Sequence, residues 1–342
     1  MTLSRHIKIV AAVLAAALLA AAAATAKSTG TQLTGAGSSF VYPLVSTWTP
    51  ALDRAFGYKI TYGSVGSGAG IAAITARTVD FGASDAPLSS DQAAACKGCV
   101  QIPWALSATS VAYNVPGAPT HLRLSGKVLA GIFLGKITAW NDPAIKKLNK
   151  GGSLPSLKIT PVYRSDASGT TFNFTEYLQA VSPEWKSKVG NSTQVNFPAG
   201  VGAKGSSGVA GLVTRTDGAI TYVDVAYALA NHIRFAAIQN RAGKYVYPGI
   251  KQIRAAAATV TRVPASNQIS IVAPPKSQAD AYPICTFTYV ILPTKTDKAK
   301  ELRKFVFWTL TQGQAYGPKL LFVPIPKPVL VAAEKTLKQV HS

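Results

Sequence analysis

The chain has 342 residues and a formal charge of +21, from 35 basic and 14 acidic residues, and 48% of its residues are hydrophobic. This composition excludes a disordered polar chain, and the length suffices for two domains with sizeable cores. The basic excess is compatible with an anionic partner, but the basic residues are scattered and form no arginine-rich arm. We therefore do not expect a protein that binds nucleic acid.

The first 26 residues have the pattern of an export signal. A basic head with Arg5 and Lys8 precedes the apolar run Ile9–Ala24, and Ala24-Thr25-Ala26 fits the small-x-small cleavage rule. The run is short and alanine-rich for a membrane span, and no second long apolar stretch follows. We predict a signal peptide over residues 1–26, cleaved near Ala26, and a mature chain without a transmembrane segment.

The first third of the mature chain alternates strands and helices through turns rich in glycine and serine. Three consecutive units of this kind occupy residues 33–56, 58–77 and 79–87. Alternation of short strands with helices is typical of an α/β fold.

Cys96-Lys97-Gly98-Cys99 is a C-x-x-C pair, and Cys285 stands alone. Zinc would require further ligands, and no histidine lies near the pair. In an exported protein, a small disulfide loop is the simplest interpretation. Gly35-x-Gly37-x-x-Phe40 lacks the third glycine of a dinucleotide fingerprint, and no phosphate-binding P-loop motif occurs. We expect neither a metal nor a cofactor.

The later sequence continues the α/β pattern. Strands are predicted at 110–115, 158–163, 219–223 and 283–292, and helices at 125–133, from 144 on, at 172–180, 209–214, 225–230, 299–311 and 326–340. The stretch 185–198 is a predicted polar connection, and 240–282 is predicted to be irregular.

The segment Arg164-Ser165-Asp166-Ala167-Ser168-Gly169-Thr170 stands where a predicted strand ends and a helix begins. A helix start presents unpaired N–H groups and a partial positive charge. Ser168, Gly169 and Thr170 would add N–H and O–H donors there, and the guanidinium fork of Arg164 suits an oxyanion. The segment predicts an anion cradle. The alternative is a helix cap with a local Arg164–Asp166 pair.

Asp85 is unusual among such donors, because a carboxylate repels an anion unless that anion carries a proton. Hydrogen phosphate carries one at neutral pH and sulfate does not, so a buried Asp85 would separate two ions of similar size. The alternative role for Asp85 is to cap the turn before Pro87.

The glycine turns and the cradle together resemble the PstS family, the periplasmic phosphate-binding proteins of phosphate-specific ABC importers. The matching segments are Gly35-Ala36-Gly37-Ser38-Ser39-Phe40, Val65-Gly66-Ser67-Gly68, Val79-Asp80-Phe81-Gly82-Ala83-Ser84-Asp85-Ala86-Pro87, Leu134-Gly135-Lys136-Ile137-Thr138-Ala139-Trp140, Arg164-Ser165-Asp166-Ala167-Ser168-Gly169-Thr170 and Gly218-Ala219-Ile220-Thr221-Tyr222-Val223. The resemblance covers residues 33–342 and is clearest through residue 230.

The resemblance implies a two-lobed periplasmic binding protein of type II, an α/β fold with the ligand cleft between the lobes. One lobe would comprise residues 27–112 plus 283–342, and the other residues 113–282. Strands would cross between the lobes near Ser110–Val115 and Pro283–Leu292. The lobes would close over the ligand by a hinge motion.

Carried over position by position, the resemblance implies a phosphate site of eight residues. These are Ser39, Phe40, Ser67, Asp85, Arg164, Ser168, Gly169 and Thr170. Asp85 would accept the proton of phosphate, and Asp166 would hold Arg164. The family more often has threonine in place of Ser39, which preserves the hydroxyl, and the Cys96/Cys99 pair is not a general family feature.

The implied function is that of a receptor and not of an enzyme. The protein would bind inorganic phosphate in the periplasm and deliver it, as a monomer, to the permease and ATPase subunits of an ABC importer. The alternative is an exported phosphatase-like hydrolase on a similar scaffold. That reading needs an activated nucleophile or a metal cluster, and His121 and His232 stand in no triad pattern.

Overall fold

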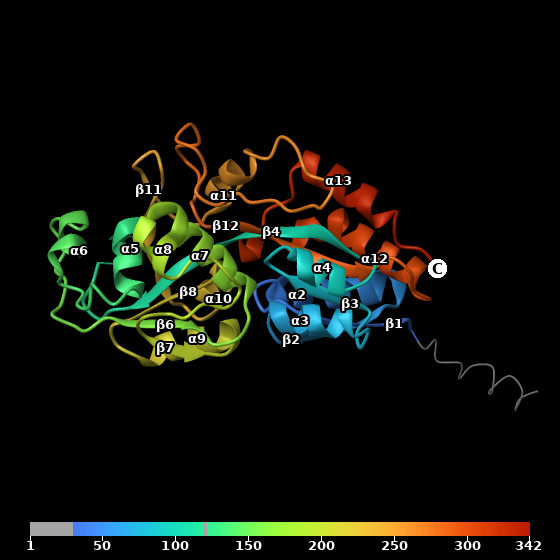
Figure 1. The fold of residues 1–342 in the computed structure, drawn as a ribbon, viewed down its shortest axis with the longest axis horizontal. Coiled ribbons are helices and arrows are strands. Elements are labelled where there is room, and N and C mark those ends of the chain that lie inside the picture. Colours follow the sequence, from blue (N-terminus) through green and yellow to red (C-terminus); the bar gives the residue numbers. More distant parts are fainter. Residues whose placement is uncertain (1–29, 120–121) are drawn as a thin grey trace, which may run out of the picture.

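The computed structural model describes residues 30–119 and 122–342, which form two α/β lobes side by side (Figure 1). The predicted signal peptide, residues 1–26, lies outside the described residues. Within them, no helix is both long enough and apolar enough to cross a membrane.

The strands are short except for one that runs through both lobes. They are β1 (Gln32–Gly37), β2 (Lys59–Ser64), β3 (Phe81–Ser84), β4 (Cys99–Asn114), β5 (Arg123–Leu124), β6 (Thr160–Arg164), β7 (Val201–Ala203), β8 (Ala219–Asp224), β9 (Arg234–Phe235), β10 (Ala237–Gln239), β11 (Tyr245–Val246) and β12 (Cys285–Pro293). Nine of them form one sheet in the order β2-β1-β3-β12-β4-β8-β6-β7, with β9 paired to β4, and a small sheet has the order β11-β10-β5.

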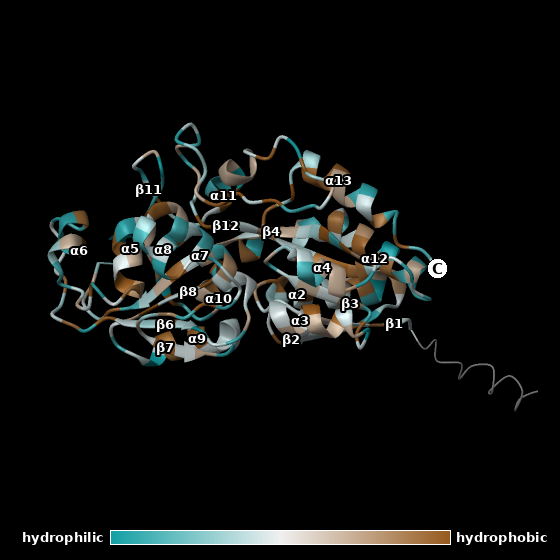
Figure 2. Cartoon of the chain, in the orientation of Figure 1, coloured by the Kyte–Doolittle hydropathy of each residue, from teal (hydrophilic) through white to brown (hydrophobic). Residues whose placement is uncertain are grey.

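Helices cover both lobes. They are α2 (Tyr42–Phe56), α3 (Ser67–Thr75), α4 (Ser90–Ala95), α5 (Gly126–Phe133), α6 (Pro143–Leu148), α7 (Gly169–Val181), α8 (Pro183–Lys188), α9 (Gly205–Arg215), α10 (Val225–Ala230), α11 (Ile250–Ala257), α12 (Ala299–Leu310) and α13 (Lys327–Leu337), with 3-10 turns η1 (Gln312–Tyr316) and η2 (Pro318–Leu320). In Figure 2, outer helices such as α5 and α13 carry both hydrophilic and hydrophobic residues, as expected of helices that cover a core.

The long strand β4 connects the lobes. Its first part, Cys99–Ala108, pairs with β12, and its last part, Thr109–Asn114, pairs with β8. The predicted strand at 110–115 covers only the last five residues of β4. Residues 101–113 of this strand are buried on both faces, so they lack the alternation that marks a half-exposed strand. The predicted lobe boundaries after residues 112 and 282 stay a prediction.

In each lobe, the turns that follow the parallel strands lie at the same edge of the sheet. In the first lobe β1 pairs in parallel with β2 and β3, and in the second β6 pairs in parallel with β7 and β8. Helices α2, α3, α7 and α9 follow the carboxyl ends of β1, β2, β6 and β7. Carboxyl ends of parallel strands are the usual place for a ligand in such sheets.

Aromatic side chains fill the core of each lobe. Trp48, Phe81, Trp104 and Phe305 contact one another in the first lobe, and Phe133, Phe174, Phe197 and Tyr222 do so in the second. These rings are buried or packed against the core, and each large ring contributes on the order of 2–3 kcal/mol by burial.

Two predictions about local structure were wrong. The stretch 240–282 contains helix α11, whose buried face is Ile253, Ala256 and Ala257. The alanine run belongs to that helix, because alanine has the highest helix propensity. The expected polar connection at 185–198 begins inside α8, where Ser182 caps the helix by accepting a hydrogen bond from the N–H of Trp185.

Candidate functional site

Asp85 follows β3 and lies where the two lobes meet. Its side chain is 2% exposed, and the Ser38 hydroxyl donates a hydrogen bond to its Oδ1. Burial raises the pKa of Asp85 from its ordinary value of 3.8 to about 7, although the hydrogen bond from Ser38 and the charge of Arg164 act in the opposite direction. A carboxyl with a pKa near neutrality can both hold and accept a proton in the physiological range.

The serines of the first lobe are oriented by backbone N–H groups. Ser67 Oγ accepts hydrogen bonds from the N–H of Asp85 at 3.3 Å and from the N–H of Gly169, in the second lobe, at 3.1 Å. Ser38 Oγ accepts from the N–H of Phe40 at 3.1 Å. The hydroxyl protons of these serines therefore point away from the backbone, toward oxygen acceptors.

Ser39 connects the lobes at a second place. Its Oγ lies 2.8 Å from Ser206 Oγ and accepts a hydrogen bond from the Ser206 N–H at 3.1 Å. Ser206 lies in the first turn of α9, and both serines are buried. Ser206 Oγ also accepts a hydrogen bond from Arg164 Nη1 at 3.4 Å. A chain of polar groups thus runs from Ser39 through Ser206 to the guanidinium of Arg164.

Arg164 ends β6 and is 4% exposed. Its Nε and Nη2 donate to the two carboxylate oxygens of Asp166 at 2.7 and 2.5 Å, and Asp166 also accepts from the N–H of Gly205 at 2.9 Å. Burial raises the pKa of Asp166, but the hydrogen bonds and charge of Arg164 outweigh it and hold that pKa below its ordinary value. The bidentate pair fixes the guanidinium plane and leaves Nη1 directed toward Ser206.

Helix α7 begins beside Asp85. Ser168 caps the helix by accepting from the N–H of Thr171 at 3.2 Å. A Cβ atom on Gly169 would lie 2.6 Å from the backbone nitrogen of Asp85, so only glycine permits this approach. Thr170 is buried, and its Oγ1 has no hydrogen-bond partner within the described residues. A buried hydroxyl that makes no hydrogen bond destabilises the folded protein, and it indicates a missing acceptor or donor.

The structure therefore brings together all of the sequence-predicted binding residues. A buried cation, a buried carboxyl, several hydroxyls and a helix start converge from both lobes. This combination suits a small oxyanion that carries a proton, because the donors match its oxygens and Asp85 matches its hydroxyl.

Comparison with known proteins gives the family. The family model of the PBP superfamily domain matches residues 22–312. A phosphate-binding protein PstS of Xylella fastidiosa is 44% identical over 299 residues, which cover 86% of this chain and 82% of that protein. The chain belongs to the PstS family. A second PstS member, from Pasteurella multocida, is 40% identical over 303 residues, which cover 87% of each chain.

A solved structure supports the fold assignment. The crystal structure of the phosphate-binding protein from Stenotrophomonas maltophilia matches with a TM-score of 0.70 at 20% identity, covering 90% of this chain and 94% of that one. The two-lobed architecture of this PstS-family chain is therefore that of a periplasmic binding protein.

Sequence reasoning missed two residues of the site, Ser38 and Ser206. Ser206 lies just before the predicted helix at 209–214, but nothing in the sequence relates this segment to Ser39. Ser38 and Ser39 are adjacent and identical in type, so their different partners, Asp85 and Ser206, follow only from the fold. The signal for Ser206 was its position after a strand and before a helix, the same position that Ser67 has.

Cys96 and Cys99 form a disulfide at the start of β4, and Cys285 is a free, buried thiol. The disulfide lies near the carboxyl end of α3, whereas Ser67 lies at the amino end of that helix. Within the described residues, no group of three or more histidine, cysteine, aspartate or glutamate side chains is arranged to hold a metal ion.

Asp85 is expected to make the stability of the phosphate-free protein fall as the pH rises. The native carboxyl holds its proton up to about pH 7, whereas the unfolded one loses it near pH 4, so the contribution is full below pH 4 and lost through pH 7. The asparagine side chain of the Asp85→Asn variant cannot ionise. In urea unfolding the variant should match the parent near pH 4 and exceed it near pH 8, by up to about 4 kcal/mol. A difference that is constant with pH would contradict the burial of an ionisable Asp85.

Proposed function

We propose that the protein binds inorganic phosphate in the site between its lobes, through Ser39, Phe40, Ser67, Asp85, Arg164, Ser168, Gly169 and Thr170. Two lines support the proposal. The PstS relatives are named phosphate-binding proteins, and their identity to this chain extends over more than four-fifths of its length. The observation that carries it is that Thr170 Oγ1, at a helix start next to a buried Asp85, is buried and has no hydrogen-bond partner among the residues that the structure describes.

The N–H of Phe40 already donates to Ser38 Oγ and that of Gly169 to Ser67 Oγ, so these two donors exchange partners when phosphate binds, whereas other donors are available. Ser168 accepts one backbone N–H, which leaves its hydroxyl proton for a phosphate oxygen. Ser67 accepts two backbone N–H groups, so its hydroxyl proton serves an oxygen acceptor, either Asp85 or the ligand. Arg164 supplies the positive charge that a dianion needs, and the fork with Asp166 holds it in place. Thr170 supplies the hydroxyl that has no partner within the described residues.

Asp85 determines the preference for phosphate over sulfate. Its carboxylate accepts the proton of hydrogen phosphate, while sulfate has no proton to give and would leave two buried acceptors facing each other. The hydrogen bond from Ser38 orients one oxygen of the carboxylate. The same carboxyl would repel a fully ionised anion.

The biological role that follows is transport. The protein would act after export, as a periplasmic monomer with its signal peptide removed near Ala26, and would deliver phosphate to the permease and ATPase subunits of an ABC importer. The PstS relatives support the binding step of this role, since they are named phosphate-binding proteins. We infer a receptor without catalysis, and the hydrolase alternative has no observation in its favour.

Thr170→Val tests the site directly. Valine has nearly the same shape but no hydroxyl, and within the described residues the hydroxyl has no protein partner to lose. We expect unchanged or slightly higher stability and phosphate affinity lower by about tenfold or more, because one buried hydrogen bond to a charged group is removed. Isothermal titration calorimetry and thermal unfolding give the two quantities.

Thr175→Val is the matched control. It lies one turn along α7, and its Oγ1 lies 2.7 Å from Oδ1 of Asn191 and donates to the carbonyl of Thr171 at 2.8 Å. It should lower stability and leave phosphate affinity within about twofold of the parent. If Thr170→Val binds phosphate like the parent while Thr175→Val does not, the binding site has been placed wrongly.

A further inference from the structure

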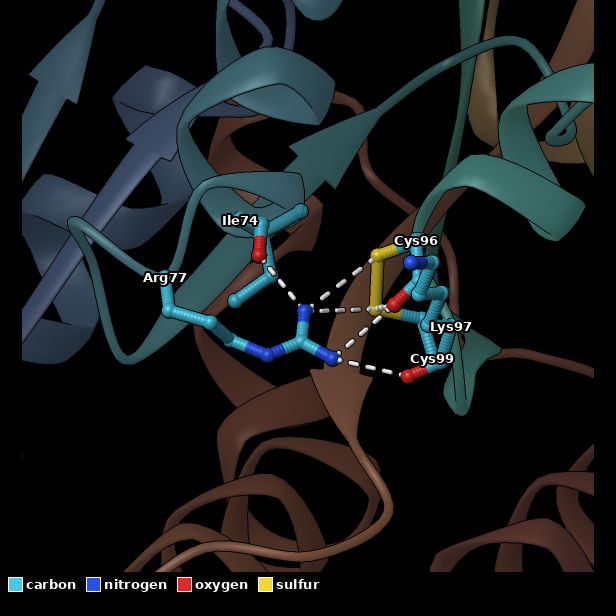
Figure 3. Close-up of a disulfide and its surroundings, with 5 residues drawn as sticks. All are labelled: Ile74, Arg77, Cys96, Lys97 and Cys99. Carbon is cyan, nitrogen blue, oxygen red and sulfur yellow. Dashed lines mark hydrogen bonds between the residues drawn. A yellow bond between two sulfur atoms is a disulfide. The ribbon is translucent and has the colours of Figure 1, made fainter.

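The disulfide of the C-x-x-C loop is held by one arginine. Arg77 follows α3, and its Nη1 donates to Cys99 Sγ at 3.1 Å and to Cys96 Sγ at 3.4 Å (Figure 3). Its Nη2 donates to the carbonyl oxygens of Cys96 and Lys97 at 2.9 and 3.1 Å, and Nη1 also donates to the Ile74 carbonyl at 2.7 Å. Five contacts therefore fix the guanidinium against both sulfurs.

This arrangement favours the reduced state more than the oxidised state. A neutral disulfide sulfur is a weak hydrogen-bond acceptor, whereas a thiolate is a full negative charge. Hydrogen bonds between charged partners are roughly twice as strong as neutral ones. The guanidinium is already held by three backbone carbonyls, so it is in place before the thiolate forms.

We propose that Cys96 and Cys99 form a thiol-responsive cystine, a modification site at which Arg77 stabilises the thiolate released by reduction. This site is separate from the proposed phosphate site and does not depend on it. Its co-reactant is a small cysteine-containing thiol or a protein dithiol.

The exchange runs through the more accessible sulfur. Cys96 is 1% exposed and Cys99 is half-buried, so the incoming thiolate attacks Cys99 Sγ. The Cys96–Cys99 bond breaks, its electron pair leaves on Cys96 Sγ, and Arg77 Nη1 stabilises that thiolate. A second thiol then attacks the mixed disulfide and releases Cys99. In total, one protein disulfide and two thiols give two protein thiols and one small disulfide.

One feature of the loop opposes this effect. Cys96 caps the carboxyl end of α4, where the helix carries a partial negative charge. That helix has only six residues, whereas Arg77 brings a full positive charge to within 3.4 Å of the same sulfur. The net effect therefore favours the thiolate.

Arg77→Gln tests the proposal by equilibration in defined glutathione buffers near pH 7, with thiols trapped by alkylation and counted by mass. The variant should be half reduced when the ratio of squared reduced glutathione to oxidised glutathione is about tenfold higher than for the parent. This corresponds to a reduction potential of the disulfide that is about 30 mV lower. Arg123→Gln, on the second lobe, is the control and should match the parent. An Arg77→Gln ratio equal to or below that of the parent would overturn the proposal.

A second measurement needs no variant. After mild reduction, the native parent is alkylated with iodoacetamide at a series of pH values, and each cysteine is followed by peptide mass. The rate at the C-x-x-C pair should reach half its maximum below the ordinary thiol pKa of about 8.5. Buried Cys285, whose pKa is raised by burial, should stay unmodified and serves as the internal control. A midpoint at or above 8.5 for both pair cysteines would refute the role of Arg77.

Discussion

Arg164→Ala is expected to weaken phosphate binding by about a thousandfold, or roughly 4 kcal/mol. The guanidinium is buried, and its bidentate contact with Asp166 fixes its plane. Its removal takes away the positive charge of the site and also leaves the Asp166 carboxylate without its partner, facing an anionic ligand. Calorimetric titration with phosphate measures the loss.

Arg234→Ala is the matched control for Arg164→Ala. Arg234 donates to the backbone carbonyls of Val115 and Ala118 at 3.0 and 3.1 Å, and it lies in the second lobe away from the site. Its removal should lower the thermal unfolding temperature and leave phosphate affinity within about twofold of the parent. The double variant Arg164→Ala/Asp166→Ala separates two effects. If it recovered parental affinity, Arg164 would act only by neutralising Asp166, and the direct contact would be refuted.

Asp85→Asn is expected to reduce the preference for phosphate over sulfate by about a hundredfold. The asparagine amide can donate N–H groups to either ion, so the proton of phosphate no longer determines which ion binds more tightly. We expect phosphate affinity to fall and sulfate affinity to rise. Competition of the two ions in calorimetry, at a pH near 8 where the parent carboxyl is ionised, measures the ratio.

Asp224→Asn controls for removal of a buried carboxyl as such. Asp224 is fully buried and caps α10, because its Oδ1 accepts from the N–H of Ala226 at 2.8 Å, whereas its Oδ2 has no hydrogen-bond partner within the described residues. Burial, together with the charge of Asp85, raises its pKa well above the ordinary value, so this control also tests a carboxyl that is coupled to Asp85. Its loss should change stability and leave the phosphate-to-sulfate ratio as in the parent. An Asp85→Asn protein that discriminates the two ions as well as the parent does would remove the proton-reading role from Asp85.

The sequence was sufficient for those parts of the site that rest on local chemistry. A strand followed by a glycine turn and a helix defines where N–H groups are exposed, and this placed Ser168 and Gly169 correctly at a helix start. Ser67 was expected in the glycine turn before a helix, and α3 begins at Ser67 itself. Asp85 was singled out because a carboxylate among anion donors requires an anion that carries a proton. Arg164 and Asp166 lie two residues apart on one turn, so their pairing follows from local geometry.

The remaining parts depend on contacts between residues far apart in the chain. The partnership of Ser39 with Ser206 joins positions 167 residues apart, and the hydrogen bond from Ser38 to Asp85 joins positions 47 apart. The length of β4 depends on β12 pairing with its first part and β8 with its last part, which no local pattern reveals. The hydrogen bonds of Arg77 to the disulfide also depend on packing and not on spacing.

Calorimetric titration of ligand-stripped protein with phosphate and sulfate tests most directly whether the interlobe site selects a protonated oxyanion. We expect saturable binding of one phosphate per chain, and sulfate affinity lower by at least about a hundredfold. Equal affinity for the two ions, or the absence of saturable phosphate binding, would contradict this selection.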